Sequence, residues 1–320
     1  MILLTFNSKD FNTYKITFIF GLGLIGRSIV SSLINPTLPL HKLEFPYSWI
    51  DFQAQKTHQK SIIKYLLKLK KSVDQSKINN INFIWSAGVS AFSAKSEELH
   101  KELISFKNTI DFFEAIRTIF NKANFSFHLI SSAGGLFEGQ CNVNENNTPN
   151  PLRPYGLFKL EQENFLISKD LDSKVFIYRP SSVYGYSDLA SSRLGLINVL
   201  IQHAVRYKVS TIYAAMHTLR DYVLVNDIGR FIANNIFSPS LSHKIFVLAT
   251  GRSSTILEII RKIETIVGRK LYIRYIANDV NSANNSYSYK ILPDGFNPTD
   301  IDTGIRKIYI NSTGIKYTSQ

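Results

Sequence analysis

Short runs of apolar residues alternate with longer segments of helical periodicity over the first two-thirds of this chain. The runs that predict buried strands cover residues 15–20, 81–88, 126–135, 174–183 and 244–250. The segment over 97–120 has the spacing of a helix. Strands separated by helices pair in parallel, and right-handed crossovers place the helices on both faces of the sheet. The pattern therefore predicts an α/β fold built on a doubly wound parallel sheet.

The pattern changes after residue 185. Helical stretches over 194–207 and 256–267 are mixed with short strands, and Asn, Ser and Tyr dominate 278–289, as is typical of a surface loop. We therefore expect a first domain over 1–185 and a smaller α/β lobe over 186–320. Late segments of that lobe are expected to return to the first domain.

A glycine-rich loop follows the first predicted strand and opens a helix. Gly21 permits a tight turn, Gly23 lets the backbone approach a pyrophosphate, and Gly26 lets the helix pack on the strand. The N–H groups and partial positive charge of the helix N-terminus attract an anion. The spacing predicts a dinucleotide site over Gly21, Gly23, Leu24, Ile25 and Gly26, with an unliganded glycine turn as the alternative.

Asp51 is the candidate for a carboxylate that binds the adenosine ribose of a dinucleotide. It lies somewhat further beyond the glycine loop than the spacing of about 20 residues usual for that acid. Three interpretations stay open: the end of a second strand beside the ribose, the end of a third strand beside the adenine, and the N-cap of a helix over 53–71. The first of them favours NAD.

Tyr155 and Lys159 are spaced i, i+4 in the segment RPYGLFKLEQENFL, so a helix places them on one face. A free phenol ionises only near pH ~10, and an ammonium group beside a phenol favours the phenolate. Such a pair moves a proton to or from a hydroxyl while a hydride is transferred. The alternative is an exposed helix pair without a catalytic role.

Charge and cysteine content narrow the classes of partner. Lys and Arg number 37 against 24 Asp and Glu, a formal net charge of +13, and the densest basic run is 64–71. That run has helical spacing, which favours a solvated helix face over a phosphate-binding one. The sequence shows no basic stripe, so nucleic-acid binding is not predicted. Cys141 is the single cysteine, which favours a reducing, cytoplasmic location. We expect no membrane span, and the seven histidines show no metal-ligand spacing, so no metal is predicted.

Five motifs in order resemble the NAD-dependent epimerase/dehydratase family, the extended short-chain dehydrogenases. They cover residues 21–26, 131–132, 155–159, 179–185 and 220–223. The stretch over 129–166 resembles members encoded with bacterial surface-polysaccharide enzymes. The resemblance implies a Rossmann-like NAD(P)-binding domain over 1–185, a substrate-binding lobe over 186–320, and NAD as cofactor, with NADP left open.

The resemblance also implies the catalytic residues. Tyr155 becomes the acid/base and Lys159 its partner, which also holds the nicotinamide ribose. Family members carry a Ser or Thr as a third catalytic residue, and the two alignments of SSAGGLF offer Ser132 or leave Ala133 at that position. Ser132 is therefore a catalytic candidate, and capping a turn is its alternative.

The same resemblance assigns binding residues. Gly88 contacts the cofactor through its backbone, Pro180 lies beside the nicotinamide, and Ser182 lies beside the sugar-nucleotide diphosphate. Arg220 clamps that diphosphate, for which a guanidinium fork is well suited. The alternative for Arg220 is a structural pair with Asp221 or Asp227.

Departures from the family pattern narrow the reaction. Dehydratases of the family place an acidic pair where this chain has Gly134 and Gly135, which disfavours elimination of water. Glu138, Glu161 and Glu163 are further carboxylates nearby; the last two are two apart on a helix, cannot share a face, and are predicted to be solvated.

The resemblance therefore predicts an NAD-dependent nucleotide-sugar epimerase acting at C4 of a UDP-hexose through a transient keto intermediate. The alternatives are an NAD(P)H-dependent reductase of a 4-keto nucleotide sugar and a non-catalytic nucleotide-binding protein. A nucleotide sugar is the expected partner, and the resemblance also implies a homodimer formed through the helix that carries Tyr155.

Overall fold

The computed structural model of the protein describes residues 1–8, 13–34, 40–73, 77–88, 96–171, 173–186, 195–237, 244–276 and 282–313. The chain divides into two compact units, and it crosses between them several times. Unit 1 comprises Met1–Ser131, Arg153–Tyr178 and Ile232–Phe246, and unit 2 comprises Ser132–Leu152, Arg179–Phe231 and Val247–Gln320.

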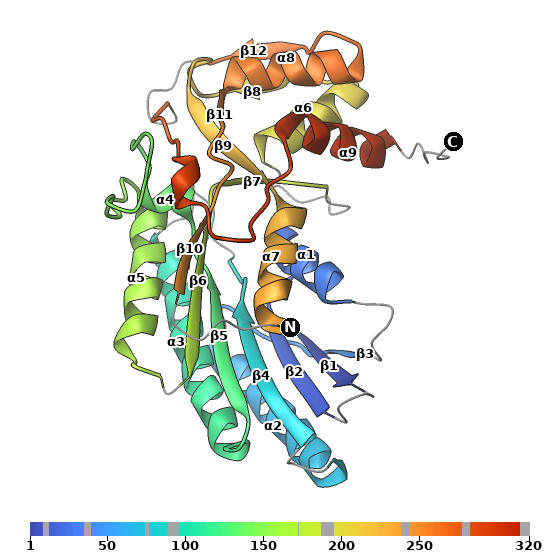
Figure 1. Cartoon of the computed structure of the whole chain (residues 1–320), viewed down its shortest axis with the longest axis vertical. Coiled ribbons are helices and arrows are strands. Elements are labelled where there is room, and N and C mark those ends of the chain that lie inside the picture. The colour runs from blue at the N-terminus through green and yellow to red at the C-terminus, as the bar shows by residue number, and fades with distance from the viewer. Residues whose placement is uncertain are drawn as a thin grey trace. The chain divides into compact units, whose positions relative to one another are not determined.

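A seven-stranded sheet in the order β10-β6-β5-β4-β2-β1-β3 organises unit 1 (Figure 1). Its strands are β1 (Ile2–Ser8), β2 (Thr13–Phe20), β3 (Leu40–Glu44), β4 (Ile78–Trp85), β5 (Asn124–Ile130), β6 (Lys174–Pro180) and β10 (Lys244–Leu248). Its helices are α1 (Leu24–Leu33), α2 (Phe52–Ser72), α3 (Ser96–Ile119) and α5 (Pro154–Ser168), and α7 (Val225–Phe237) ends within it. Strands β2, β4, β5 and β6 are parallel, as the alternating pattern predicts.

Strand β1 departs from the predicted arrangement. It runs antiparallel to both of its neighbours, so that Ile2 lies opposite Ile19 of β2 and Glu44 of β3. The strand beside the glycine-loop strand therefore precedes it in sequence, and β3 lies one position further out. A short connection suffices between antiparallel strands, whereas parallel neighbours need a long crossover. The residues 2–8 form a strand that the sequence analysis did not predict.

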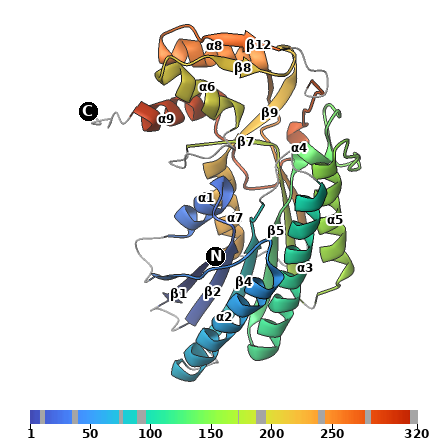
Figure 2. The same ribbon diagram turned by 180° about the vertical axis from the view of Figure 1, so that it is seen from behind.

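One face of this sheet is covered by α2, α3 and α5, as Figure 2 shows, and it is filled by aromatic rings. Phe83 is fully buried at its centre, 4.4 Å from the Phe18 ring and 5.1 Å from the Phe113 ring between centroids. Trp85 at the end of β4 packs edge-on against Trp49, with 5.6 Å between ring centroids. Fully burying aromatic side chains contributes the largest single share of a core's stability.

The opposite face carries a row of buried polar side chains that crosses four strands. Asn82 donates to Thr17 Oγ1 at 3.2 Å and accepts from Ser126 Oγ at 2.7 Å. His128 Nε2 lies 2.8 Å from the same Ser126 oxygen, and Nδ1 lies 3.0 Å from the Tyr178 hydroxyl. One proton arrangement satisfies the row: Nε2–H donates to Ser126, and Tyr178 donates to Nδ1. Burial lowers the pKa of His128 to about 3, so the ring is neutral.

Unit 2 contains two small sheets and a helical layer. Its three-stranded sheet has the order β11-β9-β7, and a pair β12-β8 lies apart from it. The strands are β7 (Ser182–Tyr184), β8 (Ser210–Ile212), β9 (Leu219–Leu224), β11 (Ser253–Thr255) and β12 (Ile273–Tyr275). The helices are α4 (Ala133–Leu136), α6 (Leu196–Val205), α8 (Ile256–Val267), α9 (Ile301–Thr313) and the 3-10 helix η3 (Tyr289–Ile291).

Helices α6, α8 and α9 bury their apolar sides against one another in unit 2. Helix α8 starts at a capping box, in which Thr255 and Glu258 bond each other's backbone N–H groups, and it ends at Gly268 with φ of +76°. Its bounds match the predicted helix over 256–267. Within the described ranges, no helix combines the length and the apolar character needed to cross a membrane.

Candidate active site

The predicted glycine loop lies between β2 and α1 and is closely packed against the end of β4. Gly21 has φ of +89°, and a Cβ there would lie 2.4 Å from the backbone N of Ala87. A Cβ on Gly26 would lie 2.0 Å from the carbonyl oxygen of Gly21. Ser86 fixes the loop by donating from Oγ to that same carbonyl at 2.7 Å. These contacts require glycine at both positions, and they bring the predicted Ser86–Gly88 segment beside the loop.

Gly23 is the glycine that faces open space. A Cβ there would meet nothing within 4 Å, and helix α1 begins directly after it without a side-chain cap or an acidic residue in its first turn. The N–H groups of that turn, which includes Leu24 and Ile25, are left for an anionic ligand. The loop therefore fits the pyrophosphate of a dinucleotide, both in the room at Gly23 and in its electrostatics.

Asp51 is engaged as the N-cap of α2. Its Oδ1 accepts from the backbone N–H groups of Gln53 at 2.9 Å and Ala54 at 3.0 Å, which is the third of the interpretations given above. Strand β3 runs in the same direction as β2, but β1 lies between them in the sheet. The end of β3 at Glu44 is therefore one strand further from the glycine loop. The exposed Glu44 is paired with Lys42 at 2.9 Å. A role for Asp51 in cofactor binding stays a prediction.

Tyr155 and Lys159 occupy the first two turns of α5, which begins at Pro154. Lys159 is only 5% exposed, so the alternative of an exposed helix pair is wrong. Its Nζ donates to the carbonyl of Ile130, the last residue of β5, at 3.3 Å and to Gln162 Oε1 at 3.1 Å. The same Nζ lies 5.9 Å from the centroid of the half-buried Tyr155 ring. The predicted proton-transfer pair therefore shares one face of α5.

Ser131 and Ser132 follow β5 directly. Ser132 Oγ accepts from the backbone N–H of Gly135 at 3.1 Å and so caps α4. This is the capping role named above as its alternative, and the hydroxyl proton remains available for a substrate oxygen. Ser131 Oγ is buried and has no hydrogen-bond partner among the described residues. A catalytic role for Ser132 stays a prediction.

The carboxylates around α5 differ from the sequence-based expectation in one case. Glu161 is exposed and lies 3.6 Å from Lys107, as expected of a solvated residue. Glu163 is 1% exposed, so the prediction that it is solvated is wrong. Positions 161 and 163 lie on different sides of the helix, and Glu163 shares the buried side with Lys159 one turn away. Gln162, which bonds that lysine, was not singled out from the sequence.

Two predicted motifs are joined in unit 2 by a buried carboxylate. Asp221 on β9 accepts from Ser181 Oγ at 2.7 Å, from the backbone N–H of Thr250 at 2.9 Å and from Thr250 Oγ1 at 2.8 Å. Burial raises the pKa of Asp221, and these hydrogen bonds oppose the shift. The carboxylate therefore holds the residues 179–185, the loop after β10 and β9 together.

The predicted substrate-binding residues lie on the strands joined by that carboxylate. Pro180 ends β6, and Ser182 begins β7, where it pairs with Tyr222 of β9. Arg220 is half-buried, and its Nη1 donates to the carbonyls of Leu219 and Ala283. The carboxylates of Asp221 and Asp227 have other partners, the latter Arg230 and Thr299. Binding roles for Pro180, Ser182 and Arg220 stay predictions, as does the backbone contact of Gly88.

The segment predicted as a surface loop over 278–289 is partly a structural element. Residues 278–281 lie outside the described residues. In the remainder, Asn285 and Tyr287 are each 3% exposed, so a solvated loop is the wrong prediction there. Asn285 donates from Nδ2 to the carbonyl of Phe137 at 2.7 Å, and its N–H bonds the carbonyl of Leu219. The polar composition that suggested a loop supplies these side-chain bonds to the backbone.

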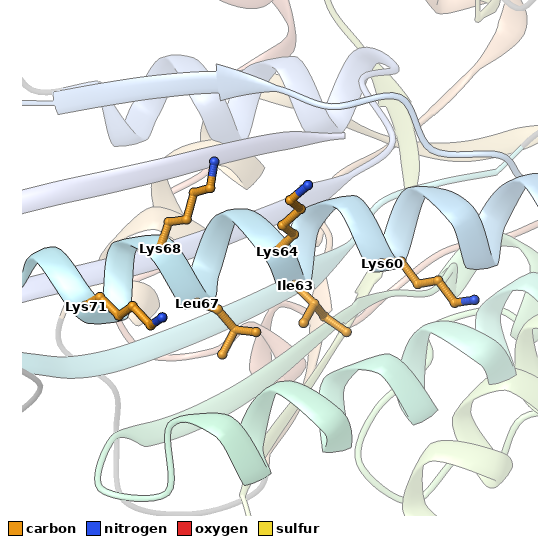
Figure 3. Close-up of a pocket in the computed structure, with 6 residues that line it drawn as sticks. All are labelled: Lys60, Ile63, Lys64, Leu67, Lys68 and Lys71. Atoms are coloured by element: carbon orange, nitrogen blue, oxygen red, sulfur yellow. The ribbon is translucent and has the colours of Figure 1, made fainter.

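The basic run of the sequence forms an exposed face of α2. Lys60, Lys64, Lys68 and Lys71 line a shallow groove of about 350 Å³ together with Ile63 and Leu67 (Figure 3). The apolar side of the same helix, with Ile62 and Leu66, is buried against the sheet. This is the arrangement of a solvated face on a core helix. Among the described residues, no group of His, Cys, Asp and Glu is arranged to hold a metal ion.

Comparison with known proteins places these motifs in one family. The sequence profile of the NAD dependent epimerase/dehydratase family matches residues 18–242. A protein from Methanocaldococcus jannaschii provisionally named UDP-glucose 4-epimerase is 27% identical over 170 residues, 52% of this chain and 53% of that protein. The dTDP-L-rhamnose 4-epimerase of Burkholderia thailandensis is 28% identical over 38% of this chain and 34% of its own length. The chain thus spans about half the length of the first relative.

Solved structures share the fold across almost the whole chain. The Thermus thermophilus UDP-glucose 4-epimerase in complex with NAD has a TM-score of 0.68, with 17% identity and coverage of 93% of this chain and 98% of that one. The RMD protein of Pseudomonas aeruginosa in complex with NADPH has a TM-score of 0.71, with 17% identity and coverage of 94% and 99%. At 17% identity this similarity establishes the Rossmann-like fold, and the activity has to be argued from the residues of the site.

Proposed function

This chain belongs to the NAD-dependent epimerase/dehydratase family, and from that premise we propose that it is a nucleotide-sugar epimerase acting at C4 of a UDP-hexose. The observation that carries the proposal is Tyr155 on one helix face with a buried Lys159 whose ammonium is held by neutral carbonyl oxygens. The substrate class rests on relatives named as epimerases of UDP-glucose and dTDP-L-rhamnose.

NAD is the proposed cofactor, because the glycine loop offers a pyrophosphate both room and free N–H groups. When bound, it would supply a reversible hydride acceptor for the sugar carbon. On the protein side, the first turn of α1 binds the anion, and Gly88, Pro180 and Asp51 are the further proposed contacts. Lys159 is proposed to hold the nicotinamide ribose.

In the proposed reaction Tyr155 removes the proton of the C4 hydroxyl as that carbon is oxidised. The ammonium of Lys159 stabilises the phenolate that Tyr155 needs in order to act as a base. Ser132 is the proposed third catalytic residue, and its hydroxyl would donate a hydrogen bond to the sugar oxygen while keeping its proton. Tyr155 returns the proton after the keto sugar has turned its other face, so no net oxidation occurs.

Substrate binding is assigned to unit 2. Arg220 presents a guanidinium for the diphosphate, and Ser182 contributes a hydroxyl from the first residue of β7. The carbonyls of Leu219 and Ala283 hold one nitrogen of Arg220, which limits the orientations of its planar group. Arginine restrained in this way loses less side-chain entropy when it binds phosphate.

The reaction is proposed as epimerisation rather than dehydration because α4 lacks acidic side chains. Gly134 and Gly135 occupy the helical turn after Ser132, where dehydratases of the family carry their acid pair. Elimination of water needs a positioned acid to protonate the leaving hydroxyl. Reversible oxidation followed by return of the hydride needs the tyrosine, the lysine and the cofactor, with Ser132 as the proposed hydrogen-bond donor, and no further acid.

The test is to purify the protein without added cofactor, identify the released nucleotide by mass spectrometry, and incubate the protein with UDP-glucose and UDP-galactose. We expect bound NAD and interconversion of a UDP-hexose pair. Unchanged UDP- and GDP-hexoses in the presence of NAD would reject the proposal. Oxidation of NADPH by a 4-keto nucleotide sugar would assign a reductase instead, and binding of neither cofactor would support the non-catalytic alternative.

We propose that the enzyme is a homodimer and that it is cytoplasmic. Leu157 and Ile167 on α5 are 57% and 54% exposed, and such apolar side chains suit a contact between two copies of this helix in a homodimer. Analytical ultracentrifugation of Leu157→Glu against the parent tests it. A cytoplasmic location is supported by Cys141, the single cysteine, which is exposed and free.

A further inference from the structure

Gln162 is the residue that makes Lys159 unusual. A buried ammonium is normally paired with a carboxylate, since taking the charge out of water is costly. The two acceptors of Lys159 Nζ are instead the backbone carbonyl of Ile130 at 3.3 Å and Gln162 Oε1 at 3.1 Å. Both acceptors are neutral, so the lysine is held in place without its positive charge being cancelled.

The amide of Gln162 is held by this bond in one orientation. The side chain is 0% exposed, and its Nε2 has no hydrogen-bond partner among the described residues. Rotating the amide by half a turn would direct its NH₂ group at the ammonium, where donor meets donor. The oxygen of Gln162 therefore has a defined task, whereas its nitrogen remains unsatisfied at a cost to folding.

An unsatisfied buried donor of this kind points to a functional compromise, because it has a cost to folding. A leucine or methionine at this position would contribute no unsatisfied polar atom of its own, but it would remove one of the two acceptors from the buried lysine. A glutamate would keep the acceptor and add a charge that cancels that of the ammonium. Glutamine alone combines an acceptor of this length with neutrality.

We propose that Gln162 is a positioning residue for Lys159: its amide oxygen and the Ile130 carbonyl fix two of the three ammonium N–H groups, and the third is left for the proton-transfer site. The inference rests on the proposed function, because it names the group that prepares the Tyr155–Lys159 pair. It extends that function by one residue of this chain that touches neither substrate nor cofactor.

The ionisable groups described on the surrounding elements define the electrostatic setting. Glu163 lies on the buried side of α5, Glu102 on α3 is 2% exposed, and His128 on β5 is neutral. Glu161 is turned to solvent beside Lys107. A carboxylate placed at position 162 would add a negative charge directly at the ammonium, which these groups do not supply through a hydrogen bond to Nζ.

The experiment compares the full-length parent with Gln162→Met, Gln162→Glu and a matched control, Gln55→Met. Gln55 is also a buried glutamine, 1% exposed, but it bonds Ser105 on α3 and lies outside the proton-transfer pair. For each protein the kcat and KM for the UDP-hexose, the pH dependence of kcat and the urea midpoint of unfolding are measured.

We expect Gln162→Met to lower kcat by about ten- to one-hundredfold, as befits the loss of a hydrogen bond to a charged group, with KM within about twofold. Gln162→Glu should retain stability better, yet it should move the low-pH limb of the kcat profile to higher pH. Gln55→Met should lower the unfolding midpoint and leave kcat within about twofold. A kcat of Gln162→Met within twofold of the parent, or an equal loss in Gln55→Met, would overturn the inference.

A readout without turnover separates this inference from the proposed function. The side-chain nitrogen resonance of Lys159 in isotope-labelled protein, assigned with Lys159→Met, should move in Gln162→Met and stay in place in Gln55→Met. If it moves while the parent fails to convert any UDP-hexose, the positioning contact stands and the epimerase proposal fails. If the parent is active and the resonance is unmoved, the positioning role of Gln162 is wrong.

Discussion

Lys159 in unit 1 and Asp221 in unit 2 are both buried charged side chains within predicted motifs, but their surroundings differ. Asp221 receives hydrogen bonds on both carboxylate oxygens, from Ser181, from the backbone of Thr250 and from its hydroxyl. Lys159 makes two hydrogen bonds with a group that has three N–H donors. The protein thus supplies hydrogen bonds to both oxygens of Asp221, whereas Lys159 keeps one N–H donor that bonds no protein group among the described residues.

The difference separates structural from chemical roles within motifs that look alike in sequence. A saturated carboxylate has no lone pair to offer a ligand, so Asp221 is suited to joining the residues 179–185 to β9. An ammonium with a spare donor can interact with a phenolate or with a ligand hydroxyl. The count of unused hydrogen-bonding capacity is thus a better guide to catalysis than burial or charge alone.

The largest expected effect concerns Lys159, the buried charge with a spare hydrogen-bond donor. Lys159→Met should lower kcat by about a thousandfold, within the range of acid–base contributions, because the base loses the charge that stabilises its ionised form. The urea midpoint should fall modestly, because Gln162 Oε1 and the Ile130 carbonyl lose their donor while a buried charge is removed. Steady-state kinetics on the UDP-hexose provides the measurement, and a loss of less than tenfold would contradict the assigned role.

The next largest effect concerns Asp221, whose carboxylate oxygens are both hydrogen-bonded. Asp221→Ala should destabilise the protein by about 3 kcal/mol, because it leaves the buried Ser181 hydroxyl and the half-buried backbone N–H of Thr250 without their acceptor, while the Thr250 hydroxyl keeps the carbonyl of Arg252. Urea unfolding monitored by circular dichroism measures the change. A change below about 1 kcal/mol would show that water satisfies these donors and that the saturation has little energetic value.

Asp221→Asn sharpens that result through its pH dependence. Burial raises the pKa of Asp221 in the folded state, so the stability it contributes is fully present below the ordinary value of 3.8 and is lost as pH rises through the raised value. The asparagine variant does not titrate. Its deficit relative to the parent should therefore be largest at acid pH and should shrink as pH rises; a deficit that grows with pH would reverse the sign assigned here.

His128 extends the comparison to a buried group that is kept neutral. Its folded pKa of about 3 lies below the ordinary 6.5, so its contribution is present above pH 6.5 and is lost as pH falls. Between pH 7.5 and pH 5 the parent should lose about 2 kcal/mol that His128→Gln does not lose. Urea unfolding of both proteins at the two pH values checks this, and parallel losses would place the proton elsewhere.

The smallest effect removes a single bond from the saturated carboxylate. Ser181→Ala should cost about 1 kcal/mol, since Thr250 continues to bind both oxygens of Asp221 through its backbone N–H and its hydroxyl. The control is Ser168→Ala, in which the exposed hydroxyl bonds the carbonyl of Phe165 on the same helix and the change should be within about 0.5 kcal/mol. Equal effects in the two variants would remove the distinction between a buried and an exposed bond.

The sequence predicted the chemistry-bearing elements because local rules determine them. The glycine loop needs Gly21 and Gly26 for contacts with the immediate backbone, and the i, i+4 spacing of Tyr155 and Lys159 needs only a helix. The parallel core strands followed from their apolar runs. These features depend on a few neighbouring residues, which is why a single sequence reveals them.

Local sequence rules do not predict which strands pair when they are distant in sequence. Residues 2–8 form β1 by pairing with β2 and β3, and no local rule selects an antiparallel partner inside a parallel sheet. The burial of Glu163 depends on how α5 is rotated about its axis, which spacing alone left open. The bond from Gln162 to Lys159 could be suspected from i, i+3 spacing, but only burial shows that it matters.

The edge-on pair of Trp49 and Trp85 gives the molecule a built-in optical probe. These are the two tryptophans of the chain, both lie in unit 1, and Trp85 immediately precedes the Ser86–Gly88 segment beside the glycine loop. Tryptophan emission therefore reports on unit 1 alone, whereas tyrosines occur in both units. Quenching on addition of NAD would give the cofactor affinity directly, and a tryptophan unfolding transition that differs from the circular dichroism transition of the whole chain would reveal that the two units unfold one after the other.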